Sequence, residues 1–156
     1  MLGHILDGKR VADSIQQQLK IAVLERQQLG LNPPGLAVIL VGNNPASRLY
    51  VNKKRQSCAS LGYYSEAYDL PEDTTQEELL ALLDRLNTAS NIHGILIQLP
   101  LPKHIDVNIV IDHIHPSKDV DGFHPYNLGR LAQLRPTLRP CTPYGIITLL
   151  NHYNLP

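Results

Sequence analysis

Little in this sequence supports a disulfide framework, a structural zinc site or a membrane span. Its 156 residues include only two cysteines, Cys58 and Cys141, which are too few for a disulfide scaffold or a four-ligand zinc site and are typical of a reducing cytosol. The apolar runs, six residues long at residues 36–41 and three at residues 95–97, fall far short of the roughly 20 residues of a membrane helix. Residues 1–9 contain Asp7 and lack the features of a secretory signal, so we expect none.

The sequence also lacks an excess of charge of either sign. Fourteen Lys and Arg residues balance fourteen Asp and Glu residues, which gives a formal net charge of +0 at pH 7. No net field therefore attracts nucleic acid or an anionic membrane surface. The composition, 43% hydrophobic and 18% charged, is that of a globular chain of about one domain. We expect a small-molecule partner, with no nucleic acid and no membrane.

The hydrophobic pattern predicts strands that alternate with helices. Apolar runs predict three strands, at residues 36–41, 64–70 and 92–98. Three-and-four spacing and capping signals predict helices at residues 9–30 and 45–61, a third that opens on a capping box at residues 74–77, and shorter ones at residues 106–114, 127–134 and from Thr142 to residue 152. Two successive βαβ units place helices on both faces of one sheet. The sequence therefore predicts an α/β fold, a three-layer α/β/α sandwich with a mostly parallel sheet.

Two of these helices carry an apolar stripe that we expect to face the core. In the first helix the stripe consists of Val11, Ile15, Leu19, Ala22 and Val23. In the third it consists of Leu79, Leu80, Leu83 and Leu86. Thr142 followed by Pro143 predicts an N-cap and a first helical turn for the last helix.

Candidate functional side chains lie where ligands bind in parallel sheets, beyond the carboxyl ends of the strands. Tyr50 and Lys54 are four residues apart, so one helix face presents an aromatic ring and an amine. The same spacing also fits a solvated lysine beside a packing tyrosine. Gln98 ends an apolar strand before Pro100 and Pro102, and its amide either faces a ligand or bonds to nearby backbone.

Metal and dinucleotide sites are not expected. Asp119 and Asp121 lack the third oxygen ligand and the glutamate of a calcium loop. Three histidines, His113, His115 and His124, have no cysteines at ligand spacing. Residues 42–47 follow a strand and open a helix, but they carry one glycine and not the three of a dinucleotide fingerprint.

Five motifs together resemble one enzyme family. They are Gly-Asn-Asn-Pro-Ala-Ser at residues 42–47, Tyr50-x-x-x-Lys54, Gly-Ile-Leu-Ile-Gln-Leu-Pro-Leu-Pro at 94–102, Lys-Asp-Val-Asp-Gly-Phe-His-Pro at 118–125 and Arg-Pro-Cys-Thr-Pro at 139–143. In this order the chain resembles, over almost its whole length, the N-terminal catalytic domain of bifunctional methylenetetrahydrofolate dehydrogenase/methenyltetrahydrofolate cyclohydrolases. The resemblance implies oxidation of 5,10-methylenetetrahydrofolate with NADP and hydrolysis of the methenyl product to 10-formyltetrahydrofolate.

The resemblance also implies roles for individual residues. Lys54 is the central catalytic group, Gln98 hydrogen-bonds and orients it, and Tyr50 stacks on the folate. Asp121 binds the amino and ring nitrogens of the pterin. Further substrate contacts are implied for Leu99, Pro100 and Ser47.

Each role has a chemical reason. The methenyl intermediate is a flat cation, which the face of Tyr50 accommodates. A neighbouring cation favours the neutral form of the Lys54 amine, which can then act as a general base toward water. An ionised Asp121 accepts two parallel hydrogen bonds and fixes the orientation of the ring.

The resemblance further implies a division of labour within a larger enzyme. Residues 1–142 are expected to be the folate-binding catalytic domain, and residues 143–156 to begin a helix leading to an NADP-binding Rossmann domain that this sequence does not contain. NADP is then bound mainly outside this chain, whose parent is expected to be a cytoplasmic homodimer. Two alternatives stay open: a catalytically inert folate-binding or dimerisation module, and a generic α/β nucleotide binder.

Overall fold

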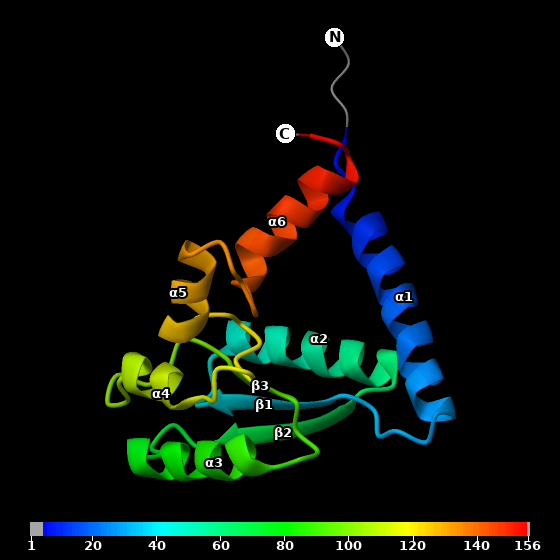
Figure 1. The fold of residues 1–156 in the computed structure, drawn as a ribbon. Helices are drawn as coiled ribbons and strands as arrows, with labels where there is room; N and C mark the ends of the chain where they lie inside the picture. Colours follow the sequence, from blue (N-terminus) through cyan, green and yellow to red (C-terminus); the bar gives the residue numbers. More distant parts are fainter. Residues whose placement is uncertain (1–4, 156) are drawn as a thin grey trace.

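The computed structural model describes residues 5–155 as a three-stranded parallel sheet with helices on both faces (Figure 1). The elements are α1 (Gly8–Gln28), β1 (Gly35–Val41), α2 (Pro45–Leu61), β2 (Tyr64–Leu70), α3 (Gln76–Thr88), β3 (Gly94–Ile97), α4 (Val107–His113), α5 (Pro125–Ala132) and α6 (Cys141–His152). The strand order is β2-β1-β3, and both pairings are parallel. The predicted α/β sandwich is therefore confirmed. Residues 1–4, which begin the segment expected to hold no secretory signal, and residue 156 lie outside the described part.

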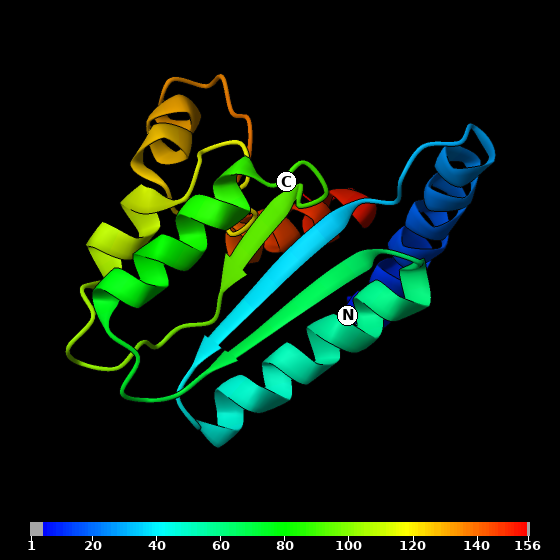
Figure 2. The same cartoon turned by 90° about the horizontal axis from the view of Figure 1, so that it is seen from below.

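The central strand β1 is buried on both faces, and its alternating side chains enter two different cores. Ala37, Ile39 and Val41 pack with the leucines of α3 and with apolar residues of α4. Val38 and Leu40 pack on the other face with α2. Figure 2 shows the sheet between these helices. This two-sided burial explains why β1 is a continuous apolar run rather than an alternating one.

The ends of α2 follow the sequence signals closely. Asn44 caps the helix because its side chain accepts a hydrogen bond from the Ser47 N–H (3.1 Å), and Pro45 occupies the first turn. At the other end Gly62 adopts a left-handed conformation with φ 77°. Because Asn44 and Pro45 set its first turn, helix α2 starts immediately after β1, at the carboxyl edge of the sheet.

The capping box of α3 lies one residue later than predicted. Thr75 and Glu78 form it, with the Glu78 N–H donating to Thr75 Oγ1 (3.2 Å) and the Thr75 N–H donating to Glu78 Oε2 (2.9 Å). The sequence offers two overlapping frames, Thr74 with Glu77 and Thr75 with Glu78. Thr74 is buried and its carbonyl oxygen contacts the His104 ring, so Thr75 is the residue that caps the helix.

Three other boundaries also differ from the prediction. Helix α6 begins at Cys141 with Pro140 as its N-cap, so Thr142 is not the cap. Helix α5 begins two residues early, at Pro125, because the His124 side chain caps it. Strand β3 begins at Gly94 and ends at Ile97, so Gln98 is the first residue beyond the strand.

Helix α1 does not pack its whole apolar stripe against the sandwich. Only Val11 and Val23 of the predicted stripe are buried, whereas Ile15 and Leu19 are exposed. The helix contacts α2 and α6 and projects away from the sheet (Figure 1). The prediction of a fully buried stripe was therefore wrong, because the helix meets its neighbours only near its ends. Among residues 5–155 no helix, α1 included, combines the length and apolarity needed to cross a membrane.

We expect Leu83→Ala to lower the free energy of unfolding by about 2–5 kcal/mol, because Leu83 is fully buried in the core between β1 and α3 and its truncation leaves a cavity. Urea unfolding followed by circular dichroism measures the change. Leu49→Ala on the exposed side of α2 is the matched control, with an expected loss below about 0.5 kcal/mol. Equal losses in the two variants would contradict this packing.

Candidate functional site

Two segments meet at the carboxyl edge of the sheet, where β1 leads into α2 and β3 leads into residues 98–102. Because β1 and β3 are adjacent and parallel, their carboxyl ends lie side by side. The Lys54 ammonium on α2 donates a hydrogen bond to Gln98 Oε1 across this edge, at 3.3 Å. The structure therefore joins the amine and the amide that the sequence singled out.

The Gln98 amide is fixed from its other end. Its Nε2 group donates to the carbonyl oxygen of Leu99 (2.7 Å), which leaves Oε1 directed at Lys54. The Ser47 hydroxyl also donates to the Leu99 carbonyl, at 3.5 Å. Ser47 is only 3% exposed, so its side chain supports the segment around Leu99 from beneath. The Gln98 amide therefore bonds to nearby backbone, as one of the two interpretations predicted, and also accepts a hydrogen bond from Lys54, while a ligand contact stays a prediction.

The aromatic residue of the site is open to solvent. Tyr50 lies one helical turn before Lys54 on α2 and is 60% exposed. Pro100 is also exposed, and the peptide bond between Leu99 and Pro100 is cis. An exposed ring beside an amine offers a surface on which a flat ligand can stack.

Asp121 enters the site from the loop between α4 and α5. Burial raises the pKa of its carboxyl above the ordinary value, the nearby Lys54 ammonium opposes that rise, and the Asp119 carboxylate adds to it. Burial also raises the pKa of the Cys141 thiol, and the charge of Asp121 adds to that effect. The Cys141 N–H donates to the Asp121 carbonyl oxygen at 3.3 Å, which joins the start of α6 to the Asp121 loop, and the charge of Lys54 on α2 acts on the Asp121 carboxyl.

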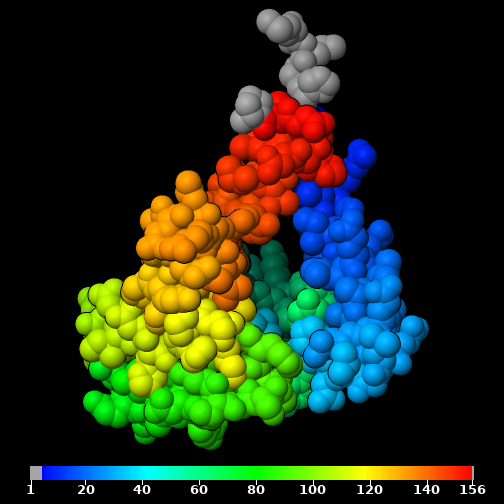
Figure 3. Space-filling model, viewed as in Figure 1, coloured from blue at the N-terminus to red at the C-terminus, as the bar shows by residue number. Residues whose placement is uncertain are grey.

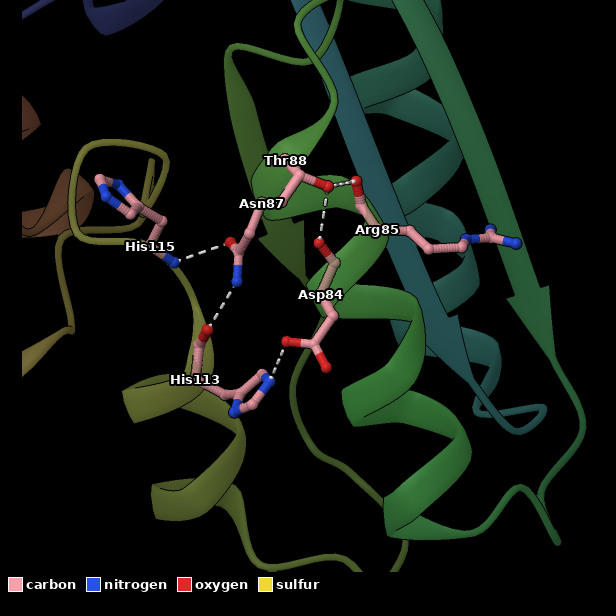
Figure 4. A network of polar contacts seen from close by, with 6 residues as sticks. All are labelled: Asp84, Arg85, Asn87, Thr88, His113 and His115. Atoms are coloured by element: carbon pink, nitrogen blue, oxygen red, sulfur yellow. Dashed lines mark hydrogen bonds and ion pairs between the residues drawn. The ribbon is translucent and has the colours of Figure 1, made fainter.

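The loop that carries Asp121 begins at a network of polar contacts between α3 and the end of α4 (Figure 4). Asn87 on α3 donates to the carbonyl oxygen of His113 and accepts from the N–H of His115, both at 2.8 Å. The His113 ring also contacts Asp84 at 2.7 Å. The chain is thus held against the end of α3 as it leaves α4.

The next residues attach the loop to the sheet. Lys118 donates through its ammonium to the carbonyl oxygens of Leu86 and Ala89, each at 2.8 Å. Its own carbonyl oxygen accepts from the Ile95 N–H at 2.7 Å, and Asp119 forms a parallel bridge with Ile95. The loop therefore runs beside β3 like a short extra strand, which carries Asp121 to the edge of the sheet.

The space around the site is partly enclosed. A cavity of about 20 Å³, with room for about one water molecule, lies between β3, α4 and the loop, and Asp119 and Asp121 contribute to its wall. A hollow opens above α2 between α1 and α6 (Figure 3). A ligand that stacks on α2 can enter from this side.

The histidines of the loop are used for structure. His115 bonds to Ser117, and His124 accepts from the Tyr126 N–H (3.0 Å), while His113 contacts Asp84. Among the residues that the structure describes, no three His, Cys, Asp or Glu side chains are grouped so that they could hold a metal ion.

The start of α2 does not fit a dinucleotide. A phosphate at this position needs free backbone N–H groups and close approach over glycines. Here Asn44 already occupies the Ser47 N–H, Pro45 has no N–H, and Gly42 is the only glycine of the loop. The loop at the start of α2 therefore lacks the geometry of a Rossmann-type phosphate site.

Sequence reasoning gave no functional role to three residues that contact the Asp121 loop. Asp119 and Asn127 are buried together behind Asp121, and Cys141 lies beside it. Asp119 and Asp121 are equivalent in the sequence, and only the fold decides which one is buried. Asn127 carried no signal, because it lies in an unremarkable stretch of a short helix.

Comparison with known proteins points to one family. Residues 6–121 match the family model described as tetrahydrofolate dehydrogenase/cyclohydrolase, catalytic domain. The chain is similar to the bifunctional methylenetetrahydrofolate dehydrogenase/cyclohydrolase of Campylobacter jejuni, with 45% identity, a TM-score of 0.94, and coverage of 97% of this chain and 54% of that one.

Two further solved structures extend the comparison. A 5,10-methylenetetrahydrofolate dehydrogenase from the silkworm Bombyx mori is 37% identical, with a TM-score of 0.94 over 98% of this chain and 53% of that one. The Trypanosoma brucei dehydrogenase-cyclohydrolase, complexed with NADP and an inhibitor, is 35% identical, with a TM-score of 0.92 over 98% and 52%. The chain thus spans about half the length of these relatives.

We expect Gly122→Ala and Gly129→Ala to change stability in opposite directions. Gly122 follows Asp121 with φ 73°, and a Cβ there would lie 2.4 Å from the Arg139 carbonyl carbon, so alanine should cost about 1–3 kcal/mol. Gly129 lies inside α5 with open space around it, and alanine should stabilise by about 0.5–1 kcal/mol. Thermal unfolding of both variants tests this, and a Gly122→Ala melting temperature at or above wild type would refute the loop geometry.

Proposed function

Because the chain belongs to the tetrahydrofolate dehydrogenase/cyclohydrolase family, we propose that it binds a tetrahydrofolate substrate at the Tyr50, Lys54, Gln98 and Asp121 site. There it catalyses hydrolysis of 5,10-methenyltetrahydrofolate to 10-formyltetrahydrofolate. The observation that carries the proposal is the hydrogen bond between Lys54 and Gln98, which lies within electrostatic reach of Asp121.

Binding is divided between a stacking residue and a carboxylate. The exposed ring of Tyr50 receives the flat face of the pterin and tolerates its positive charge in the methenyl form. The Asp121 carboxylate accepts two donors from the edge of the pterin and fixes which way round it lies. Leu99 and Pro100 line the same edge, and Ser47 acts through the Leu99 carbonyl.

Lys54 moves the proton in the hydrolysis. The neutral amine takes a proton from water as the water oxygen bonds to the methenyl carbon, which neutralises the ring cation. The protonated amine then returns that proton to the departing ring nitrogen as the carbon–nitrogen bond breaks, and the hydroxyl group of the tetrahedral intermediate releases its own proton to solvent as the formyl C=O bond forms. Gln98 holds Nζ in line through its Oε1 atom, so the amine needs no reorientation between the two transfers.

The oxidation that precedes this step belongs to the proposed activity of the larger enzyme. NADP supplies the hydride acceptor when bound, and the trypanosome relative was solved with that cofactor. The loop at the start of α2 does not fit a dinucleotide, and no step proposed for this chain is routed through NADP. We place NADP binding in a domain beyond residues 1–142, with the last residues forming the connection.

The remaining proposals concern the setting of the enzyme. Cys58 and Cys141 are both unpaired thiols, which supports a reducing, cytoplasmic compartment. Exposed apolar side chains on α6, Tyr144, Ile146 and Ile147, together with the exposed part of α1, support burial of this side of the molecule in a homodimer or against another domain. This uncovered face also favours the alternative that the chain serves only as a folate-binding or dimerisation module.

We expect the affinity of the chain for folic acid to fall as the pH is lowered. Burial raises the pKa of Asp121, so its carboxylate is protonated at a higher pH than an ordinary carboxyl near about 3.9, and protonation removes the acceptor. Calorimetry at several pH values measures this. Asp121→Asn and Tyr50→Ala should bind at least about tenfold more weakly at pH 7, and Asp121→Asn should lose the acid dependence above pH ~4. Equal affinity in all three proteins would count against the site.

We expect Lys54→Met to reduce hydrolysis of methenyltetrahydrofolate by about 10²–10⁴-fold, because the proton acceptor is lost. The loss of methenyl absorbance reports turnover by the chain. Lys53→Met is the matched control, since it removes a neighbouring exposed ammonium from the same helix and should leave the rate near wild type. If the wild-type chain binds folic acid without turnover, the inert-module alternative replaces the catalytic one.

A further inference from the structure

A second carboxylate lies directly behind the candidate site and has no assigned role. Asp119 is only 2% exposed, and both of its oxygens accept hydrogen bonds from its own loop. The Gly122 N–H donates to Oδ1 at 3.0 Å, and the His124 N–H donates to Oδ2 at 2.8 Å. These two N–H groups belong to the first and the third residue after Asp121, so the Asp119 carboxylate holds the backbone that follows Asp121.

The same carboxylate is tied into the body of the protein. Asn127 of α5, 1% exposed, donates to Asp119 Oδ2 at 2.9 Å and with the same amide to the Pro116 carbonyl oxygen at 2.9 Å. Its own Oδ1 accepts from the Thr137 hydroxyl at 2.8 Å. The chain of bonds from Asp119 through Asn127 to Thr137 therefore joins the loop to α5 and to the connector before α6.

The backbone of the loop is also fixed from the opposite side. The Cys141 N–H donates to the carbonyl oxygen of Asp121 (3.3 Å), and the Cys141 thiol donates to the Val120 carbonyl oxygen (3.0 Å). With Asp119 bridged to Ile95 of β3, the residues on both sides of Asp121 are immobilised. Among residues 5–155 no hydrogen bond within the protein uses the Asp121 carboxylate, so these contacts fix its backbone and leave the carboxylate available to a ligand.

We propose that Asp119 is the positioning residue for Asp121, a buried carboxylate clamp that holds the loop backbone so that the Asp121 carboxylate meets the substrate in one orientation. The inference rests on the proposed function for the substrate, but the clamp itself is a property of the free chain. An anion suits this position better than an amide. It accepts from three donors at once, whereas an asparagine would turn its NH₂ group toward the His124 N–H or the Gly122 N–H.

The clamp has an electrostatic consequence for its neighbour. The charged groups that act on Asp121 are Lys54 from α2 and Asp119 from its own loop, and the Cys141 thiol of α6, whose pKa is raised, faces it as a neutral titratable group. The Asp119 carboxylate is a like charge, so its presence raises the pKa of Asp121, and its removal should lower that pKa. A looser loop would expose Asp121 to water and lower its pKa further, so both effects of removing Asp119 have the same sign.

The test compares the titration of Asp121 in three proteins by carbon-detected NMR of side-chain carboxyls, with Asp121→Asn used to assign the signal. We expect Asp119→Asn to lower the midpoint by about half a pH unit or more. Lys118→Met removes two other hydrogen bonds of the same loop, to the Leu86 and Ala89 carbonyls, and serves as the matched control. It should lower the melting temperature and leave the midpoint in place. An unchanged midpoint in Asp119→Asn, or the same shift in Lys118→Met, overturns the proposal.

Hydrogen exchange in the wild-type chain decides the question if Asp119→Asn does not fold. The N–H groups of Gly122 and His124 should be protected relative to that of Phe123, which the clamp does not use. Equal exchange at all three positions overturns the clamp.

Folic acid binding then connects the clamp to function. Asp119→Asn should bind at least tenfold more weakly than wild type, and Lys118→Met should bind equally well; wild-type affinity in Asp119→Asn overturns the positioning role. If the wild-type chain itself binds no folic acid, the proposed function is wrong. The titration of Asp121 and the hydrogen exchange of Gly122 and His124 still test the role of Asp119 in that case.

Discussion

The parallel pairing of β1 with β3 is the constraint on which the rest of the molecule depends. It aligns the carboxyl ends of two buried strands, so that α2 starts and residues 98–102 turn away at the same edge. Lys54 and Gln98 are 44 residues apart in the chain and meet only because of this alignment. Side chains on both faces of β1 bury the pairing between α2 and α3, which makes this edge a rigid platform.

The third component of the site arrives by a different route. Asp121 lies on a loop, and loops hold a catalytic geometry only when their backbone bonds are satisfied by the scaffold. Here the parallel bridge between Asp119 and Ile95 and the hydrogen bonds accepted by the buried Asp119 carboxylate hold the backbone on both sides of Asp121. The site thus combines a rigid amine–amide pair with a half-buried carboxylate whose charge the surroundings regulate.

Local signals in the sequence predicted what local physics controls. Pro45 and Gly62 marked the ends of α2, and the continuous apolar run marked β1 as a central strand. The sequence alone could not decide between two residues that fit the same local motif equally well. Thr74 and Thr75 both fit a capping box, and Asp119 and Asp121 share one motif, so tertiary contacts had to decide which was buried. The apolar stripe of α1 led to a wrong prediction of burial. Its periodicity is helical, as the structure confirms, but the fold leaves much of the stripe without a packing partner.

The central claim is that a flat folate ring lies on the Tyr50 face beside Lys54, gripped by Asp121. Intermolecular nuclear Overhauser effects between folic acid and the isotope-labelled chain test it most directly. The account predicts contacts from the pterin proton to the Tyr50 ring and to the Lys54 methylene groups. If the chain is saturated with folic acid and the Overhauser contacts are confined to another surface, the claim is contradicted.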